Sequence, residues 1–251
     1  MSTEKSLALV LRVVDFSETS VVATLFTREF GKIHGLAKGA RRPKGPFESA
    51  LDLLSLCRLV FLRKSSDALD LLTEAKLERR FRAAARGLSY LYAGYYVAEL
   101  LDELTHDGDP HPELFDLACH TLAALDSGPE PVSALLLAFE LSALRILGHL
   151  PQLDQCVECG AALPAEGRVA FGMLAGGVLC ARCRPGKSHV VSLSQGAWQL
   201  LRQFARPAAA ARADEPDRRA YGEVRGVLNQ YLSHLLGRRP RMHEYLGILA
   251  D

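Results

Sequence analysis

Four cysteines in the second half of the sequence have the spacing of a metal site. They form two Cys-x-x-Cys pairs, Cys156 with Cys159 and Cys180 with Cys183, and 20 residues separate the pairs. Each pair offers two thiolates from one tight turn, and the chain between the pairs can form a hairpin that brings all four together. We expect these cysteines to bind one Zn²⁺ ion in a tetrahedral site.

A shell of four thiolates leaves no position for water, so this zinc would be structural rather than catalytic. Redox disulfides and an iron–sulfur cluster are the alternatives for such pairs. Redox exchange is the weaker one, because neither pair begins a helix that follows a strand, the setting that lowers a thiol pKa. The two remaining cysteines, Cys57 and Cys119, lie in apolar stretches and are expected to fill the core.

A second stretch carries charge of one sign. No acidic residue occurs from Phe30 to Phe47, and the five basic residues there are Lys32, Lys38, Arg41, Arg42 and Lys44. Glycines and two prolines oppose a helix or strand over 38–47, so we expect an irregular loop that presents its charges to solvent. Such a loop suits contacts with nucleic-acid phosphates, and the alternative is a loop whose charge only maintains solubility.

Short apolar segments surround this loop. Their β-branched and apolar residues predict five strands, over 6–14, 20–27, 32–37, 53–63 and 69–77. Five strands within about 80 residues, with no helical segment between them, predict a small closed or partly closed barrel. The aromatic residues near the basic loop are expected to lie in its core rather than to stack on bases.

From residue 78 the apolar residues recur at helical spacing. Helices are expected over 78–105, 113–125, 132–147, 194–206 and 218–236. The third is apolar on nearly every side and should be the buried centre of a bundle. The predicted fold is therefore α+β and multidomain, with a barrel at 1–80, an α-helical domain at 81–153 and 188–251, and a zinc-binding insertion at 154–187.

The net charge of +1 conceals a segregation of the two signs. Residues 1–80 contain 14 basic and 10 acidic residues, 81–153 contain three and ten, and 188–251 contain nine and six. The basic ends suit a polyanion, and the acidic middle suits a basic protein partner. A polar N-terminus and the lack of an apolar run of membrane-spanning length lead us to expect a cytoplasmic protein that does not associate with membranes.

The sequence contains no recognisable catalytic motif. It lacks a phosphate-binding loop ending in Lys-Ser/Thr, a dinucleotide fingerprint, a Gly-x-Ser-x-Gly elbow and His-Glu-x-x-His, and its eight histidines are scattered singly. We therefore do not expect an enzyme. A zinc-containing hydrolase remains one alternative, and an RNA-binding transcription or translation accessory factor with a barrel and a zinc ribbon is another.

Several motifs occur in a distinctive order. They are Thr-Arg-Glu-Phe-Gly-Lys-Ile at 27–33, Ala-Lys-Gly-Ala-Arg-Arg-Pro-Lys at 37–44, Gly-Gly-x-x-Cys-x-x-Cys at 176–183 and Tyr-Leu-x-His-Leu-x-Gly-Arg at 231–238. Together they resemble the RecO family of bacterial recombination mediators. The resemblance implies an N-terminal OB-fold, binding of single- and double-stranded DNA, strand annealing and help in loading RecA. It also implies RecR and the single-stranded DNA-binding protein as partners.

The resemblance also implies roles for individual residues. Carried over by position, DNA contacts fall on Lys38, Arg41, Arg42 and Lys44, with Lys32 beside them, and zinc ligands fall on the four paired cysteines. Two places depart from the family pattern: Gly45 stands where a serine is expected, and residues 239–242 lack an expected Lys-Ser pair. Both departures leave the charge pattern intact.

Overall fold

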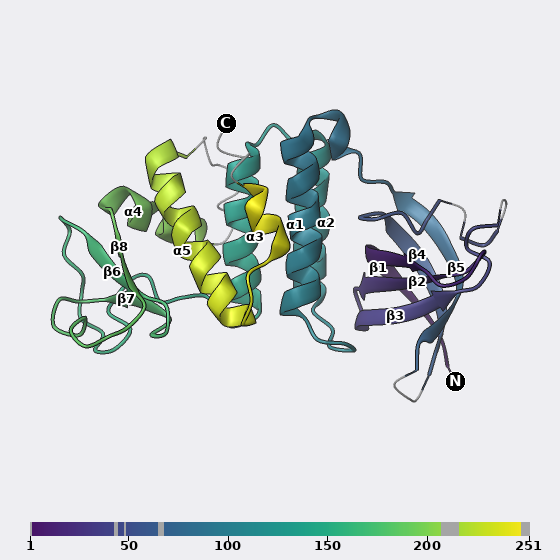
Figure 1. The fold of residues 1–251 in the computed structure, drawn as a ribbon, viewed down its shortest axis with the longest axis horizontal. Helices are drawn as coiled ribbons and strands as arrows, with labels where there is room; N and C mark the ends of the chain where they lie inside the picture. The colour runs from purple at the N-terminus through teal and green to yellow at the C-terminus, as the bar shows by residue number, and fades with distance from the viewer. Residues whose placement is uncertain (1, 43–44, 48, 65–67, 207–215, 247–251) are drawn as a thin grey trace. The chain divides into compact units, whose positions relative to one another are not determined.

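The computed structural model describes residues 2–42, 45–47, 49–64, 68–206 and 216–246 of the chain (Figure 1). It contains two compact units, Met1–Gly128 and Pro129–Asp251. Unit 1 holds a β-barrel and two helices, and unit 2 holds three helices and a small sheet. The functional division of the chain into barrel, helical domain and insertion stays a prediction.

Five strands form the closed barrel of unit 1, as predicted. They are β1 (Ser2–Asp15), β2 (Val21–Thr27), β3 (Gly31–Ala37), β4 (Leu56–Arg63) and β5 (Asp70–Arg79). Their order around the barrel is β1-β2-β3-β5-β4, and only the pairing of β3 with β5 is parallel. This is the five-stranded Greek-key arrangement of an OB-fold, so the predicted fold class is confirmed.

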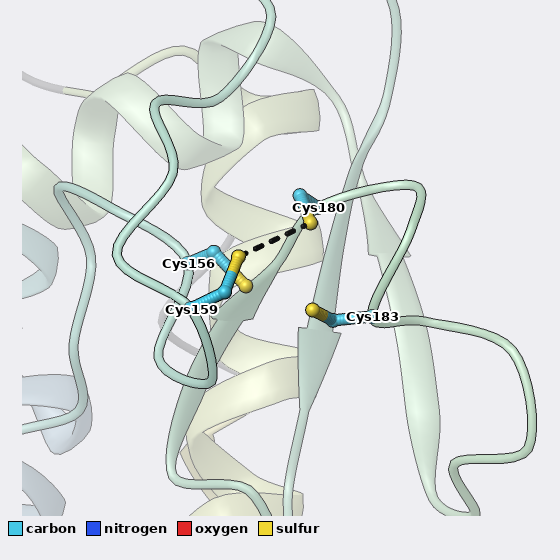
Figure 2. Close-up of side chains that lie close together, drawn as sticks. All are labelled: Cys156, Cys159, Cys180 and Cys183. Carbon is cyan, nitrogen blue, oxygen red and sulfur yellow. Dashed lines mark hydrogen bonds between the residues drawn. The ribbon is translucent and has the colours of Figure 1, made fainter.

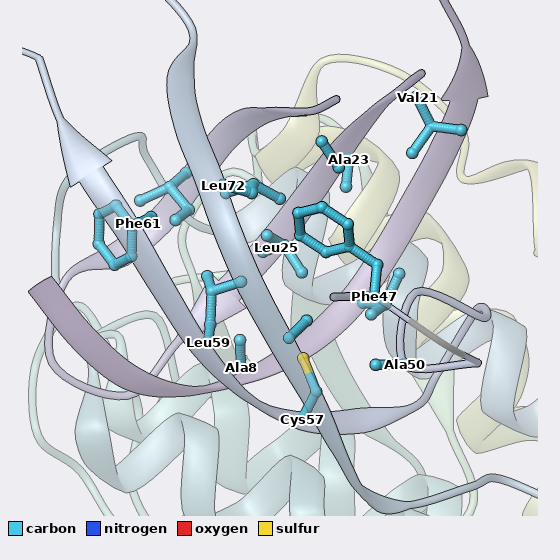
Figure 3. Packing of buried hydrophobic residues seen from close by; sticks show 14 residues of the cluster. Ala8, Val21, Ala23, Leu25, Phe47, Ala50, Cys57, Leu59, Phe61 and Leu72 are labelled. Atoms are coloured by element: carbon cyan, nitrogen blue, oxygen red, sulfur yellow. The ribbon is translucent and has the colours of Figure 1, made fainter. Parts of the chain in front are cut away.

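Alternating apolar residues of these strands fill the barrel interior. Figure 3 shows Ala8, Leu25, Leu59 and Phe61 pointing into a common core, and each is fully buried. Phe47, at the end of the basic loop, reaches the same core and is also buried. Burying a phenylalanine side chain contributes about 1.5–3 kcal/mol, so the loop is anchored to the barrel at that end.

Two helices complete unit 1: α1 (Leu88–Leu104) and α2 (Pro112–Ser127). The prediction of one helix over 78–105 was wrong for its first ten residues. There β5 continues to Arg79, which pairs with Leu56, and a short 3₁₀ turn, η1 (Ala83–Ala85), follows. Gly87 then adopts φ 139°, a conformation that side chains disfavour, and α1 begins directly after it.

Helix α2 is fastened to the barrel at two neighbouring positions. The rings of Phe26 on β2 and Phe115 on α2 have centroids 6.1 Å apart. Beside them, Arg28 donates from Nε and Nη2 to the two carboxylate oxygens of Asp116, each over 2.9 Å. The two-pronged contact fixes the rotation of α2 against the barrel as well as its distance.

The described residues of unit 2 form three α-helices and three strands. In chain order they are α3 (Val132–Ile146), β6 (Val169–Gly172), β7 (Gly177–Leu179), β8 (Val190–Leu193), α4 (Gln195–Phe204) and α5 (Arg218–Leu236), followed by the 3₁₀ turn η3 (Arg241–Glu244). Helix α3 is buried along most of its length, as its apolar composition predicted. Strand β8, which pairs with β6, was not predicted.

Local capping interactions mark the start of α4 and the end of α5. Ser194 caps α4 by accepting a hydrogen bond at Oγ from the N–H of Ala197 over 3.2 Å. Helix α5 ends at Gly237, whose left-handed φ of 68° closes the last turn.

Among the helices of the described residues, none combines the length and the apolar content needed to cross a membrane.

Candidate zinc site and nucleic-acid interface

The four paired cysteines converge in unit 2 (Figure 2). Their Sγ atoms all lie within 4.8 Å of one another, and those of Cys159 and Cys180 are 3.8 Å apart. Strands β6 and β7 form the antiparallel hairpin that the spacing predicted, and β7 leads directly into the second pair. The two pairs thus meet although 20 residues separate them in the sequence.

Backbone hydrogen bonds hold the first cysteine pair in place. The N–H of Gly160 donates to the carbonyl of Cys156 over 2.8 Å, and the N–H of Val157 donates to the carbonyl of Val178 on β7 over 2.9 Å. At the base of the hairpin, a Cβ on Gly177 would lie 2.5 Å from the carbonyl oxygen of Gln152. A glycine is therefore needed for the two chains to approach.

One sulfur–sulfur distance matches the value expected around a zinc ion. Tetrahedral zinc–thiolate bonds of about 2.3 Å place neighbouring sulfurs about 3.8 Å apart, which is the distance between Cys159 and Cys180. Four sulfur donors are also the soft ligand set that structural zinc prefers. The cysteine cluster can therefore hold a metal ion and is compatible with zinc.

The environment of the thiols favours thiolate at two of the four positions. Burial raises the pKa of Cys156, but N–H groups of Cys180, Cys159 and Glu158 outweigh it and bring this pKa to about 6. The N–H of Ala161 contributes most to lowering the pKa of Cys159. The contact with Cys159, followed by that with Cys180, raises the pKa of Cys183 to about 12. Close packing of four thiols thus opposes their joint ionisation, which a bound cation would reverse.

The other two cysteines behave as core residues, as predicted. Cys57 is fully buried in the barrel, and Cys119 on α2 is half-buried. Burial raises the pKa of Cys57 to about 12 and that of Cys119 to about 11. Both thiols therefore stay protonated and unreactive at neutral pH.

The basic loop between β3 and β4 is hydrogen-bonded to the turn between β1 and β2. Arg41 donates its backbone N–H to the carbonyl of Thr19 over 3.0 Å, and its Nη1 lies 2.9 Å from Oδ2 of Asp15. Gly39 donates its N–H to Oγ of Ser20 over 3.4 Å. Lys38, Arg41 and Arg42 are exposed on this surface, while Lys44 lies outside the described residues.

Lys32 occupies a different environment from the other basic residues of its stretch. Its ammonium group donates to the carbonyls of Asp102 and Thr105 at the end of α1, over 2.6 and 3.0 Å. The Asp102 carboxylate is 3.3 Å away, and the Lys32 side chain is only 11% exposed. Because these groups already satisfy its three N–H donors, Lys32 is not included in the DNA-contacting surface proposed below.

The aromatic residues near the loop lie in the barrel, as expected. Phe26 and Phe47 are buried, and Phe30 packs edge-on against Phe61 with ring centroids 5.4 Å apart. His34 bridges Thr24 and Asp107 through its two ring nitrogens, at 3.1 and 3.2 Å. The Arg63 guanidinium also lies over the Phe30 ring, 5.5 Å from its centroid.

Sequence reasoning missed two basic residues at the end of β4. Lys64 and Lys38 line a common cleft of about 300 Å³ on the barrel, and Arg63 lines the neighbouring cleft, which also contains Lys64. The available signal was the pair Arg63-Lys64 at the start of the connection between the fourth and fifth strands. In OB-folds that connection and the one between the first two strands flank the ligand-binding surface.

Known protein families match almost the whole chain. The model described as recombination protein O, N terminal, matches residues 1–81, and the model described as recombination protein O, C terminal, matches residues 86–244. The chain belongs to the RecO family. A RecO-family protein of Rhodopirellula baltica, named DNA repair protein RecO, is 45% identical, and the alignment covers 98% of this chain and 99% of that protein.

Other RecO-family relatives extend the match. A protein of the same name from Anaeromyxobacter dehalogenans is 40% identical over 98% of this chain and 96% of its own length. One from Halalkalibacterium halodurans is 32% identical over 80% of this chain and 76% of its own length. The resemblance drawn from the four motifs is thereby confirmed, and family membership supports a role in DNA repair or recombination.

Proposed function

We propose that this RecO-family chain is a non-catalytic DNA-binding mediator of repair. It would bind single- and double-stranded DNA, promote annealing of complementary strands, and help load RecA together with RecR and the single-stranded DNA-binding protein. The observation that carries the proposal is the surface formed by Lys38, Arg41 and Arg42, held rigidly on an OB-fold. Family membership supports the annealing and loading roles, which the geometry alone would not suggest.

The basic loop supplies the physical basis for binding. A cation that contacts a phosphate releases counterions condensed on DNA. The entropy gained by these released ions contributes to the affinity in addition to the contact itself. The backbone N–H groups of Gly39, Arg41 and Arg42 are hydrogen-bonded before DNA arrives, which reduces the entropy that these residues lose on binding. Annealing then requires only that basic surfaces offset the repulsion between two strands, with no bond made or broken.

We also propose that the four paired cysteines bind Zn²⁺ and that this zinc is structural. Four sulfurs fill its coordination shell, so no position is left for a water nucleophile. Binding of zinc would contribute folding free energy to the module made of the two cysteine turns and the β6–β7 hairpin. A zinc hydrolase mechanism finds no support in this donor set.

The proposed function is tested by fluorescence anisotropy of a labelled single-stranded DNA across a salt series. We expect the wild-type affinity to fall steeply with salt, and a variant with Lys38, Arg41 and Arg42 all changed to Ala to bind more weakly and with a shallower salt dependence. An RNA strand of the same sequence serves as a competitor. Stronger binding of RNA than of DNA would favour an RNA-binding accessory factor instead.

A control variant removes the same number of positive charges from another surface of the barrel. Lys5, Arg58 and Lys76 are exposed on β1, β4 and β5, and they line a separate cleft of the same barrel. Changing these three residues to Ala removes the same number of positive charges. If the control variant loses as much affinity and salt dependence as the loop variant, binding is a property of overall charge and the assignment to the loop fails.

A further inference from the structure

An exposed aromatic residue, Phe16, lies in the turn whose backbone is hydrogen-bonded to the basic loop. Phe16 follows β1 and is 63% exposed, whereas the other nine phenylalanines, all within the described residues, are buried or half-buried. Val13 and Val14, at the end of the same strand, are also exposed. Exposing a phenylalanine forgoes about 1.5–3 kcal/mol of burial, so a binding role explains the position better than packing does.

The turn that carries Phe16 is ordered by its own hydrogen bonds. The N–H groups of Phe16 and Ser17 both donate to the carbonyl of Ser20, over 2.9 and 3.1 Å, and the N–H of Ser20 donates back to Oγ of Ser17 over 3.3 Å. The backbone beneath the ring is therefore fixed. A ring on a fixed backbone loses little conformational freedom when a ligand packs against it.

The same turn holds the basic loop. Thr19 and Ser20 accept the hydrogen bonds that fix Arg41 and Gly39, and Asp15, the residue before Phe16, pairs with the Arg41 guanidinium. Phe16 and the cations of the loop thus belong to one hydrogen-bonded surface. The remaining acidic residue of the turn is Glu18, and it is exposed.

We propose that Phe16 is a stacking platform for an unpaired DNA base whose phosphates contact Lys38, Arg41 and Arg42. The inference rests on the proposed DNA binding and adds strand selectivity to it. Single-strand binding surfaces combine a cationic track for the backbone with an aromatic face for the bases. In a duplex both faces of each base are covered by its neighbours, so Phe16 contributes only to single-strand binding. The exposed cations of the loop that is hydrogen-bonded to this turn favour this occupant over an apolar protein surface.

The test compares three labelled ligands in anisotropy titrations at one low salt concentration. They are oligothymidylate, a duplex of the same length, and a strand of the same length built from abasic nucleotides, which keeps its phosphates and lacks bases. We expect Phe16→Ala to weaken binding of oligothymidylate by roughly 5- to 150-fold. Binding of the duplex and of the abasic strand should change less than about twofold, because both ligands offer phosphates but no free base.

Two variants accompany Phe16→Ala. Phe16→Tyr keeps the aromatic face and is expected to retain oligothymidylate binding. Leu88→Ala removes a side chain that is 61% exposed at the start of α1, away from the basic loop in sequence, and is expected to change none of the three affinities. If Phe16→Ala weakens all three ligands equally, or none of them, the stacking role is overturned while DNA binding by the wild type stands. If the wild type binds none of the ligands, the proposed function itself fails and the inference fails with it.

A direct measurement uses Phe16→Trp. The chain has a single tryptophan, Trp198 in unit 2, so the difference spectrum between the variant and the wild type reports position 16. Stacking on thymine is expected to quench this added fluorescence, and the abasic strand is expected to leave it unchanged. Equal quenching by both strands would show that the ring senses nearby phosphates rather than a base.

Discussion

Glu140 on α3 and Arg225 on α5 form an ion pair in the interior of unit 2. Their side chains are 0% and 9% exposed, and Nη2 of Arg225 also donates to Oδ1 of Asn229 over 2.7 Å. Removing two charges from water costs several kcal/mol per ion, and the attraction between them repays this cost only while both partners are present. The pair therefore links α3 to α5 through a buried contact whose contribution depends on both partners.

We predict that Glu140→Leu lowers the free energy of unfolding of unit 2 by about 3–5 kcal/mol, because it leaves the Arg225 charge buried without the Glu140 carboxylate. The double variant Glu140→Leu/Arg225→Met should recover most of this loss. Urea unfolding followed by the fluorescence of Trp198, which is buried in unit 2, measures the effect. A double variant no more stable than Glu140→Leu would mean that the loss comes from packing and not from the unpaired charge.

Lys32 gives a prediction that separates a structural lysine from a DNA-contacting one. Lys32→Met keeps the aliphatic chain but leaves the carbonyls of Asp102 and Thr105 without their charged donor. We expect the end of α1 to be destabilised by roughly 1–3 kcal/mol, measured as faster hydrogen exchange of its amides. The salt dependence of DNA binding should stay at the wild-type slope.

Lys38→Met is the matched control, since Lys38 is exposed in the basic loop. It should leave the exchange of α1 unchanged and reduce the salt slope by about one. The opposite pattern, in which Lys32→Met reduces the salt slope and Lys38→Met does not, would mean that Lys32 contacts DNA.

Local signals in the sequence were sufficient for most of the fold. Segments of β-branched and apolar residues located the barrel strands, helical spacing located α4, and the spacing of the cysteine pairs predicted that the four cysteines converge. Each of these features is set by residues near one another in the chain, which is the range over which periodicity and capping act. The helix expected over 78–105 was wrong at its start because pairing of Arg79 with β4, a contact with a distant strand, extends β5.

The roles of individual charges could not be predicted in the same way. Lys32 and Lys38 lie in one stretch without acidic residues. Carbonyl groups at the end of α1, some 70 residues later, accept hydrogen bonds from the ammonium group of Lys32, whereas Lys38 is exposed. Phe16 was overlooked because its exposure depends on how far the ends of β1 and β2 extend beyond the core. These distinctions arise from tertiary contacts, for which sequence periodicity carries no signal.

The proposed zinc site gives a prediction about folding. Cys180→Ser removes one of four ligands, so we expect loss of bound zinc and a large fall in the melting temperature of unit 2, because metal binding in such sites contributes folding free energy on the order of 10 kcal/mol. Zinc content by mass spectrometry and melting followed by Trp198 fluorescence measure both effects. Cys119→Ala, outside the cluster, should keep full zinc content. A variant that loses zinc but melts with the wild type would contradict the structural role.

His243 in η3 makes the stability of unit 2 depend on pH. Burial, together with the positive charges of Arg225 and Arg239, lowers its pKa to about 4, whereas the usual value for an unfolded chain is about 6.5. Arg225 is itself paired with Glu140, and Arg239 supplies a second positive charge that disfavours the protonated imidazole. Between these two pKa values the unfolded state binds a proton that the folded state does not. Stability is therefore full above about pH 6.5 and falls as the pH drops toward 4.

The measurement is urea unfolding at a series of pH values between these limits, again followed by Trp198. We expect His243 to contribute a loss of at most about 3 kcal/mol across this window. His243→Gln cannot take up the proton and should show a correspondingly flatter pH dependence, even if it is less stable at neutral pH. His149→Gln, which changes an exposed histidine of the same unit, should keep the wild-type slope. If His243→Gln and the wild type lose stability in parallel as the pH falls, another group in unit 2 governs the transition.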